Sequence, residues 1–167
     1  MTDLDSRLLH AELDGLFSNE WTVSEGAEVL ARLKGSPWTF QAQADVGGRS
    51  FTYKANWTGS KIAVWDDLGE RVVARAEKMD LFARRYRVLP LGRSEAAGGS
   101  PELIIVSGTL SRTFRLWLGD EEVGSIRYKG VLGRQVELRV PSNMPLELVV
   151  LGLYISRTVR RQTGGHG

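Results

Sequence analysis

The chain has 167 residues, of which 42% are hydrophobic, 8% aromatic and 25% charged, which is the composition of an ordinary globular domain. It contains no cysteine and only two histidines, His10 and His166. Disulfide frameworks, thiolate catalysis, thiolate metal ligation and S-palmitoylation are therefore excluded, and histidine-based metal or triad chemistry is poorly supplied. We expect one domain in a cytoplasmic, reducing compartment, with no cofactor and no metal site.

The formal net charge of +2 conceals an uneven distribution of charge along the chain. Residues 1–30 are rich in acids, whereas residues 71–93 and 157–167 are rich in arginine. Basic segments of this kind attract anions. Two alternatives stay open: the acidic segment folds over the basic one, or both are solvated faces.

The N-terminal segment, MTDLDSRLLHAELDG, is acidic where a secretory signal is basic, so we expect no export signal. Thr2 and Asp5 resemble a capping box. Apolar residues then recur at helical spacing: Leu4, Leu8, Leu9, Leu13, Leu16 and Phe17. We predict an amphipathic helix over residues 3–17, in an N-terminal segment that spans residues 1–18.

From about Trp21 onward the hydrophobic period changes to two, which is typical of strands. The clearest pair of strands flanks Gly47-Gly48, because glycine adopts the positive φ angles of a tight hairpin turn. One set of side chains alternates inward in this pair: Trp38, Phe40, Ala42, Ala44, Phe51, Tyr53, Ala55 and Trp57. A second turn at residues 66–69 separates strands at 62–65 and 71–77.

Further strand-like runs cover residues 29–33, 81–89, 103–107, 113–118, 122–128 and 135–140. Small and polar residues at 92–101 predict a surface loop. A meander of about ten strands curls and leaves aggregation-prone edges unless it closes. We therefore predict a mainly β protein in which an antiparallel meander forms a single barrel over residues 19–162.

The strongly apolar run at residues 148–155 is too short to cross a bilayer, which needs about 20 residues. An all-round apolar helix is typical of a helix surrounded by protein. A barrel of about ten strands is too wide for its own side chains to fill. The sequence therefore predicts that a helix at residues 146–161 runs through the barrel, followed by a disordered tail at 163–167.

Three stretches of this sequence look like parts of a known family. KIAVWDDLGERVVARAEK looks like a strand, an Asp-Gly turn and a strand of its barrels, and EEVGSIRYKG resembles a recurrent strand. RQVELRVPSNMPLELVVLGLYIS resembles the last strand, the proline-containing connection and the buried helix. Over residues 21–162 the chain thus resembles the tubby C-terminal-like superfamily, which includes phospholipid scramblases and plant LURP-one-related proteins. The resemblance implies about ten to twelve strands around a C-terminal helix.

This sequence departs from the scramblase branch, which has a Pro-rich region, a Cys-rich palmitoylated segment and an acidic calcium-binding stretch. We therefore do not expect lipid scrambling. The tubby branch binds phosphoinositide headgroups through basic residues on its barrel, but no residue of that site can be aligned with this chain. The resemblance implies a ligand-binding or scaffold barrel and assigns no site.

Motifs for nucleotide binding, zinc proteases and serine hydrolases are absent, so no catalytic residue can be nominated and we do not expect an enzyme. Two carboxylate clusters, at residues 66–67 and 120–122, lie beside glycine at turns, where acids usually form the turn. Glu147 lies at the start of the predicted buried helix, where the helix dipole stabilises a carboxylate. We assign structural roles to all three.

Our candidate site is an arginine cluster on one wall of the barrel, formed by Arg71, Arg75, Arg85 and Arg87. Alternation places Arg85 and Arg87 on one face of a strand, beside Arg71 and Arg75 if the two strands pair as a hairpin. Guanidinium groups bind phosphate or carboxylate in a bidentate manner. The alternative is a network of ion pairs with Glu77, Asp80 or the acidic N-terminal segment.

The sequence therefore predicts a non-enzymatic binding or scaffold protein that recognises an anionic small molecule or a phospholipid headgroup through this wall, in the cytoplasm or at a membrane surface. The alternative is a protein-interaction module whose acidic N-terminal helix docks on a protein partner or a second copy. The aromatic residues alternate with mostly uncharged ones, so nucleic acid is not expected. Arg157, Arg160 and Arg161 are interpreted as the basic end of the buried helix.

Overall fold

The computed structural model describes residues 5–15, 18–36, 39–68, 70–79, 84–90, 102–108 and 112–163. These residues form twelve strands and one helix. The strands are β1 Ser6–Leu13, β2 Glu20–Glu25, β3 Glu28–Gly35, β4 Gln41–Val46, β5 Arg49–Ala55, β6 Lys61–Asp66, β7 Arg71–Lys78, β8 Arg85–Pro90, β9 Leu103–Ser107, β10 Thr113–Leu118, β11 Glu121–Lys129 and β12 Gln135–Pro141. The helix, α1, spans Leu146–Gln162.

The twelve strands form one closed antiparallel barrel in which each strand pairs with its neighbours in the sequence. The ring closes where β1 pairs with β12, in a register that runs from Ser6 opposite Pro141 to Glu12 opposite Gln135. Closure leaves no edge strand in the sheet. The predicted barrel of ten to twelve strands is therefore confirmed.

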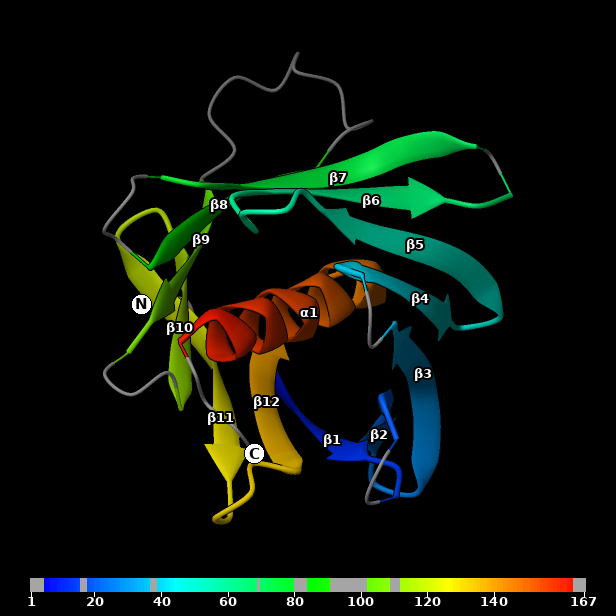
Figure 1. Cartoon of the computed structure of the whole chain (residues 1–167). Helices are drawn as coiled ribbons and strands as arrows, with labels where there is room; N and C mark the ends of the chain where they lie inside the picture. The colour runs from blue at the N-terminus through cyan, green and yellow to red at the C-terminus, as the bar shows by residue number, and fades with distance from the viewer. Residues whose placement is uncertain are drawn as a thin grey trace.

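The helix α1 passes through the barrel, as Figure 1 shows, and confirms the helix predicted from the apolar run. Its central residues, from Val149 to Ile155, are all buried. The wall makes room for the helix with small inward side chains: Ala11, Ala31, Ala42, Ala44, Ala74 and Ala76. The helix and the inward side chains of the wall thus form one hydrophobic core. The helix occupies an interior that the wall side chains of a barrel this wide cannot fill alone.

Tyrosine hydroxyl groups inside the barrel hold the helix to the wall. Tyr53 donates to the carbonyl of Glu147 at 2.9 Å, and Tyr128 lies 2.7 Å from Ser156 Oγ. Tyr154 of α1 donates to the carbonyl of Phe40. Buried hydroxyl groups need such partners, because an unpaired one costs about 1–3 kcal/mol. These bonds fix the depth of α1 in the barrel.

The predicted N-terminal helix is wrong, because residues Ser6–Leu13 form strand β1 instead. Leu9 and Ala11 point inward and are buried, whereas Leu8 is 41% exposed. Adjacent leucines are compatible with the period of a helix and with that of a strand. The backbone pairing of this segment with β12 on one side and β2 on the other stabilises the strand. The barrel therefore begins at β1, not at residue 19. The alternative of a protein-interaction module loses the helix assigned to it, and docking on a protein partner stays a prediction. Thr2, Leu4, Leu16 and Phe17 lie outside the described residues.

The hairpin around Gly47-Gly48 is confirmed, with φ angles of 59° and 83°. Phe51 and Tyr53 are buried as predicted, but Trp57, expected to point inward, is 84% exposed. β5 ends at Ala55, so Trp57 lies in the following turn and no longer obeys the alternation of the strand. Trp38, the loop at residues 92–101 and the tail after residue 163 lie outside the described residues.

In the described part of the chain, no helix has the length and apolar character needed to cross a membrane.

Candidate functional site at the mouth of the barrel

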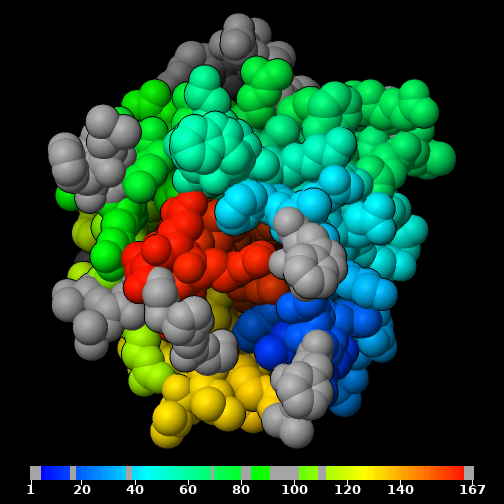
Figure 2. Space-filling view, viewed as in Figure 1, coloured from blue at the N-terminus to red at the C-terminus, as the bar shows by residue number. Residues whose placement is uncertain are grey.

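The helix α1 ends at one mouth of the barrel, which is formed by the connections β1–β2, β3–β4, β5–β6, β7–β8, β9–β10 and β11–β12. Gln162 Nε2 donates to the carbonyl of Thr58 in the β5–β6 turn at 2.6 Å, which places the helix end at this rim. In the space-filling view the red end of α1 is visible at the surface between these segments (Figure 2). We call this end the basic mouth.

The two ends of the barrel carry opposite charge. Among the described residues of the basic mouth, the connections and the helix end carry Arg84, Arg112, Arg134, Arg157, Arg160 and Arg161 against the single acid Asp14. The described connections and chain segments at the other end carry only acids: Asp5, Asp67, Glu70, Glu102, Asp120 and, in the first turn of α1, Glu147. The described connections thus give the barrel a polarity along its axis, which favours anions at the basic mouth. This polarity differs from the segregation along the sequence, because Asp5 is the only acid of residues 1–30 among the six at the acidic end.

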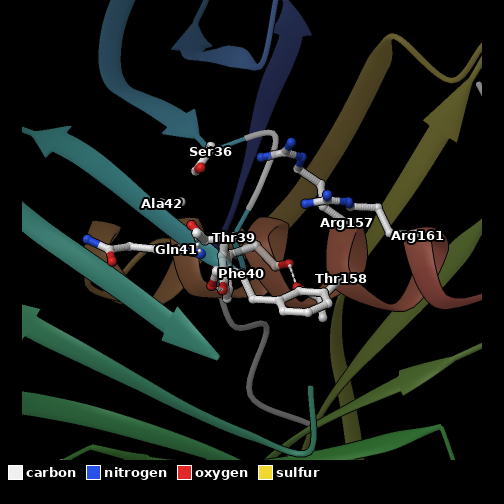
Figure 3. Close-up of a pocket in the computed structure, with 10 residues that line it drawn as sticks. Ser36, Thr39, Phe40, Gln41, Ala42, Arg157, Thr158 and Arg161 are labelled. Carbon is white, nitrogen blue, oxygen red and sulfur yellow. Dashed lines mark hydrogen bonds between the residues drawn. The ribbon is translucent and has the colours of Figure 1, made fainter. Parts of the chain in front are cut away.

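A small cavity of about 10 Å³ lies in the basic mouth between α1 and the β3–β4 connection. An open groove of about 340 Å³ has part of its lining in common with this cavity and extends toward Lys34 and Gln43. Both are lined by Gly35, Ser36, Thr39, Gln41 and Ala42, and the cavity also by Tyr154, Arg157, Thr158 and Arg161. Arg157 and Arg161 reach from α1 toward the connection that carries Ser36 (Figure 3). We call the cavity and groove together the mouth cleft.

Arg157 is the most unusual residue of the mouth cleft, because no ion pair among the described residues involves it. Burial lowers the pKa of Arg157, and the neighbouring charge of Arg161 acts in the same direction. Its guanidinium carbon lies 5.7 Å from the centre of the Trp21 ring, a cation–π contact that offsets part of the desolvation. A charge in this position is stabilised further by an anion that enters the cleft.

The other arginines of the helix end also lie over aromatic rings. The guanidinium carbon of Arg160 is 4.2 Å from the centre of the Tyr128 ring, and that of Arg161 is 5.8 Å from the centre of the Phe40 ring. These contacts orient both side chains at the rim. The positive charges of Arg160 and Arg161 also complement the negative, C-terminal end of the helix dipole, as interpreted from the sequence.

The lining of the mouth cleft offers two kinds of polar group. Arg157 and Arg161 supply charged N–H groups that suit phosphate or carboxylate oxygens. Ser36, Thr39 and Gln41 supply hydroxyl and amide groups from the opposite wall. The sequence predicts only that these arginines end the helix. Nothing local in it indicates that the β3–β4 residues lie beside them.

The β7–β8 hairpin is confirmed, and Arg75, Arg85 and Arg87 lie on its outer face. Arg71 does not continue this face, because the register shift next to Trp65 places it opposite the buried Asp66 of β6. Arg75 lies opposite Leu89, and two pairs further along Arg87 lies opposite Glu77 on the same face. Arg85 lies near Met79, whose N–H donates to the Arg85 carbonyl at 2.9 Å. Since eight residues separate Arg71 from Met79, Arg71 and Arg85 lie about 26 Å apart along the strands. The four side chains therefore do not converge on one small ligand.

Two carboxylates interrupt the centre of this wall. Glu77 lies directly opposite Arg87 in the ladder, and Glu102 Oε2 lies 3.3 Å from Arg87 Nε. These neighbours match the alternative of a cross-strand charge network. The pair is largely exposed, so it contributes at most about 1 kcal/mol to stability. Anion binding at Arg71, Arg75, Arg85 and Arg87 stays a prediction.

The carboxylates of the β6–β7 turn make structural contacts. Asp66 accepts a hydrogen bond from Arg49 at 2.8 Å, and Asp67 accepts from Ser50 and Thr52 at 2.8 and 2.7 Å. These bonds tie the turn to β5. Within the described residues, no group of three His, Asp or Glu side chains is placed to hold a metal ion.

The fold was compared with known proteins. No protein-family model matches the sequence, and no curated protein is similar to it. Among solved structures, the protein AT5G01750 from Arabidopsis thaliana is similar, with a TM-score of 0.61 and 11% sequence identity over 92% of each chain. That protein is a LURP-one-related protein with a tubby-like barrel. The chain therefore has the barrel-and-helix fold of this plant protein.

Proposed function

We propose that the protein is a non-enzymatic binding barrel related to the LURP-one-related and tubby-like proteins, and that it takes a phosphate or carboxylate group in its mouth cleft. The observation that carries the proposal is the charged Arg157 side chain, which lies partly buried in the cleft and forms no ion pair with any described carboxylate. An anion that reaches Arg157 meets the hydroxyl and amide groups of the β3–β4 connection.

The polar groups inside the barrel support a binding role rather than a catalytic one. The hydroxyl groups of Tyr53, Tyr86 and Tyr154 donate to backbone carbonyls, and that of Tyr128 pairs with Ser156. Burial raises the pKa of Tyr128 and of Tyr154 to about 12, so both stay protonated near neutral pH. Tyr53, Tyr128 and Tyr154 thus hold the helix in place, and Tyr86 holds the β5–β6 turn, which supports structural roles for these hydroxyl groups.

Calorimetric titration at low ionic strength tests the proposal with three soluble anions: inorganic phosphate, pyrophosphate and citrate. We expect at least one of them to bind the wild type and to bind Arg157→Met at least tenfold more weakly, since a charge-assisted hydrogen bond contributes about 1.5–3 kcal/mol. Methionine retains the apolar stem of the side chain, and the melting temperature shows whether the variant folds.

Arg85→Gln and Arg87→Gln serve as matched controls, because they remove a guanidinium from the outer wall and leave the mouth cleft intact. We expect both to bind as the wild type does. Weaker binding by the two wall variants with unchanged binding by Arg157→Met would move the site to the wall. Absence of binding by the wild type to all three anions would refute the proposal.

A further inference from the structure

We infer that the basic mouth docks onto the surface of an anionic lipid bilayer, with Trp57 as an anchor in the headgroup region. The inference rests on the proposed function only in the sign of the charge that the mouth attracts. It adds a partner and a surface that the mouth cleft does not define.

Trp57 is presented to solvent on a turn that is firmly held. Inside the turn, Asn56 Nδ2 donates to Ser60 Oγ at 3.0 Å, and the hydroxyls of Thr58 and Ser60 lie 2.7 Å apart. The turn is also bonded to the helix end through Gln162 and to β8 through Tyr86. The indole is nevertheless 84% exposed. The backbone therefore holds Trp57 outward rather than letting it fold back onto the barrel.

Other apolar side chains are exposed on the opposite side of the same mouth. In the β11–β12 turn, Val131 is 92% and Leu132 is 55% exposed. Because β5–β6 and β11–β12 lie half the ring apart, a flat surface laid across the mouth reaches both turns. Exposed apolar residues that are scattered singly need no explanation, so Trp57, Val131 and Leu132 support the inference only together with the charge of the same rim.

Basic side chains lie at the β11–β12 turn, beside Val131 and Leu132. Arg112 donates to the carbonyls of Gly130 and Val131, and Arg134 donates to that of Gly15, so neither charge is neutralised by a described carboxylate. Each basic residue near an anionic leaflet contributes about 1 kcal/mol, and tryptophan favours the membrane–water interface. Charge and aromatic character thus favour a bilayer over a free anion as the partner of the rim.

We expect charge, and not exposure alone, to select the docking face, and the opposite end of the barrel offers the comparison. Leu68 in the β6–β7 turn is 94% exposed, which is even more than Trp57. Its neighbours Asp67 and Glu70 are acidic, and an anionic surface repels them. Leu68→Ser is therefore the matched control for Trp57→Ser.

Co-sedimentation tests the inference with vesicles of phosphatidylcholine alone and of phosphatidylcholine mixed with phosphatidylserine. We expect the wild type to bind the mixed vesicles and to be released by salt. Trp57→Ser should bind about tenfold more weakly, which is the fold-change for withdrawing one large apolar side chain from a partly buried site. Leu68→Ser should bind as the wild type does. Equal binding by the two variants, or equal binding to neutral and mixed vesicles, would overturn the inference.

Fluorescence gives a second readout on the same vesicles. Brominated phosphatidylcholine quenches only a tryptophan that reaches the bilayer. We expect quenching in the wild type, and its loss in Trp57→Phe at a protein concentration where the variant is still bound. Quenching that persists in Trp57→Phe would place another tryptophan at the bilayer and overturn the assignment.

The two proposals fail in distinguishable ways. Trp57 does not line the mouth cleft, so Trp57→Ser should keep the soluble-anion binding of the wild type. Anion binding without vesicle binding would refute the docking and leave the cleft. Vesicle binding that depends on Trp57, without binding of any soluble anion, would support the docking and refute the cleft as an anion site.

Discussion

The phenol of Tyr53 on β5 donates a 2.9 Å hydrogen bond to the backbone carbonyl of Glu147, in the first turn of the central helix. The same ring packs against Tyr154, with 5.7 Å between the ring centres. Burial raises the pKa of Tyr53 far above its usual range, and the charge of Glu147 acts in the same direction. One side chain of the wall thus contacts the helix at two levels and links its entry to its centre.

We expect Tyr53→Phe to lower the free energy of unfolding by about 1–2 kcal/mol, because the ring stays in the core while the hydroxyl donor is lost. Urea denaturation followed by circular dichroism measures the change. Tyr128→Phe is the comparison, and its cost should be smaller because Ser156 Oγ keeps its 2.8 Å bond to the carbonyl of Leu153. A larger loss in Tyr128→Phe than in Tyr53→Phe would contradict this ranking.

The buried tyrosines also make stability depend on alkaline pH. The pKa values of Tyr128 and Tyr154 rise from 10.0 to about 12, because burial disfavours the charged phenolate. The folded protein therefore retains protons that the unfolded chain releases. The stabilisation is fully present below pH 10 and is lost as the pH rises toward 12.

Between these pH values each of the two tyrosines should lower the free energy of unfolding by about 1.4 kcal/mol per pH unit. Urea denaturation at a series of alkaline pH values, with tyrosinate absorbance followed in parallel, measures the slope. Tyr128→Phe should have a shallower slope than the wild type. A free energy of unfolding that stays constant above pH 10 would show that the hydroxyl groups are not buried as described.

Among the described glycines, Gly124 on β11 has the least room for a side chain. A Cβ built there lies 2.2 Å from the backbone oxygen of Arg139 on β12. The β10–β11 register shifts next to this position, so the ladder is already irregular. We expect Gly124→Ala to destabilise the protein by about 3 kcal/mol, because two backbones must separate.

The neighbouring Ser125→Ala, in which no Cβ is added, is the control and should change stability by less than about 0.5 kcal/mol. Thermal unfolding of the two variants makes the comparison. A melting temperature of Gly124→Ala equal to that of the wild type would contradict the close approach of the β11 and β12 backbones at this position.

The adjacent leucines of β1 distinguish a strand from a helix. Leu9 is fully buried and Leu8 is 41% exposed. We expect Leu9→Ala to cost roughly 3 kcal/mol and Leu8→Ala less than about 0.5 kcal/mol. In an amphipathic helix both side chains would share the apolar face and cost similar amounts. Chemical denaturation of the two variants decides between these outcomes.

The candidate site was much less predictable than the fold. The arginines of the helix end are visible in the sequence, but their neighbours Ser36 and Gln41 lie more than a hundred residues away along the chain. Spacing along a strand shows which face a side chain occupies, and that prediction was correct for Arg85 and Arg87. It does not show the register between two strands, which separates Arg71 from Arg85.

The sequence by itself determined the alternation that defines the strands after residue 20, the Gly47-Gly48 turn and the apolar run of α1, because each depends on residues that are near one another in the chain. The tertiary structure alone decided that residues 6–13 form a strand and that Trp57 faces solvent. Residues 6–13 form a strand because they pair with β12, and Trp57 faces solvent because β5 ends before it. The charges of the connections gather into a basic and an acidic mouth only once the ring of strands is closed.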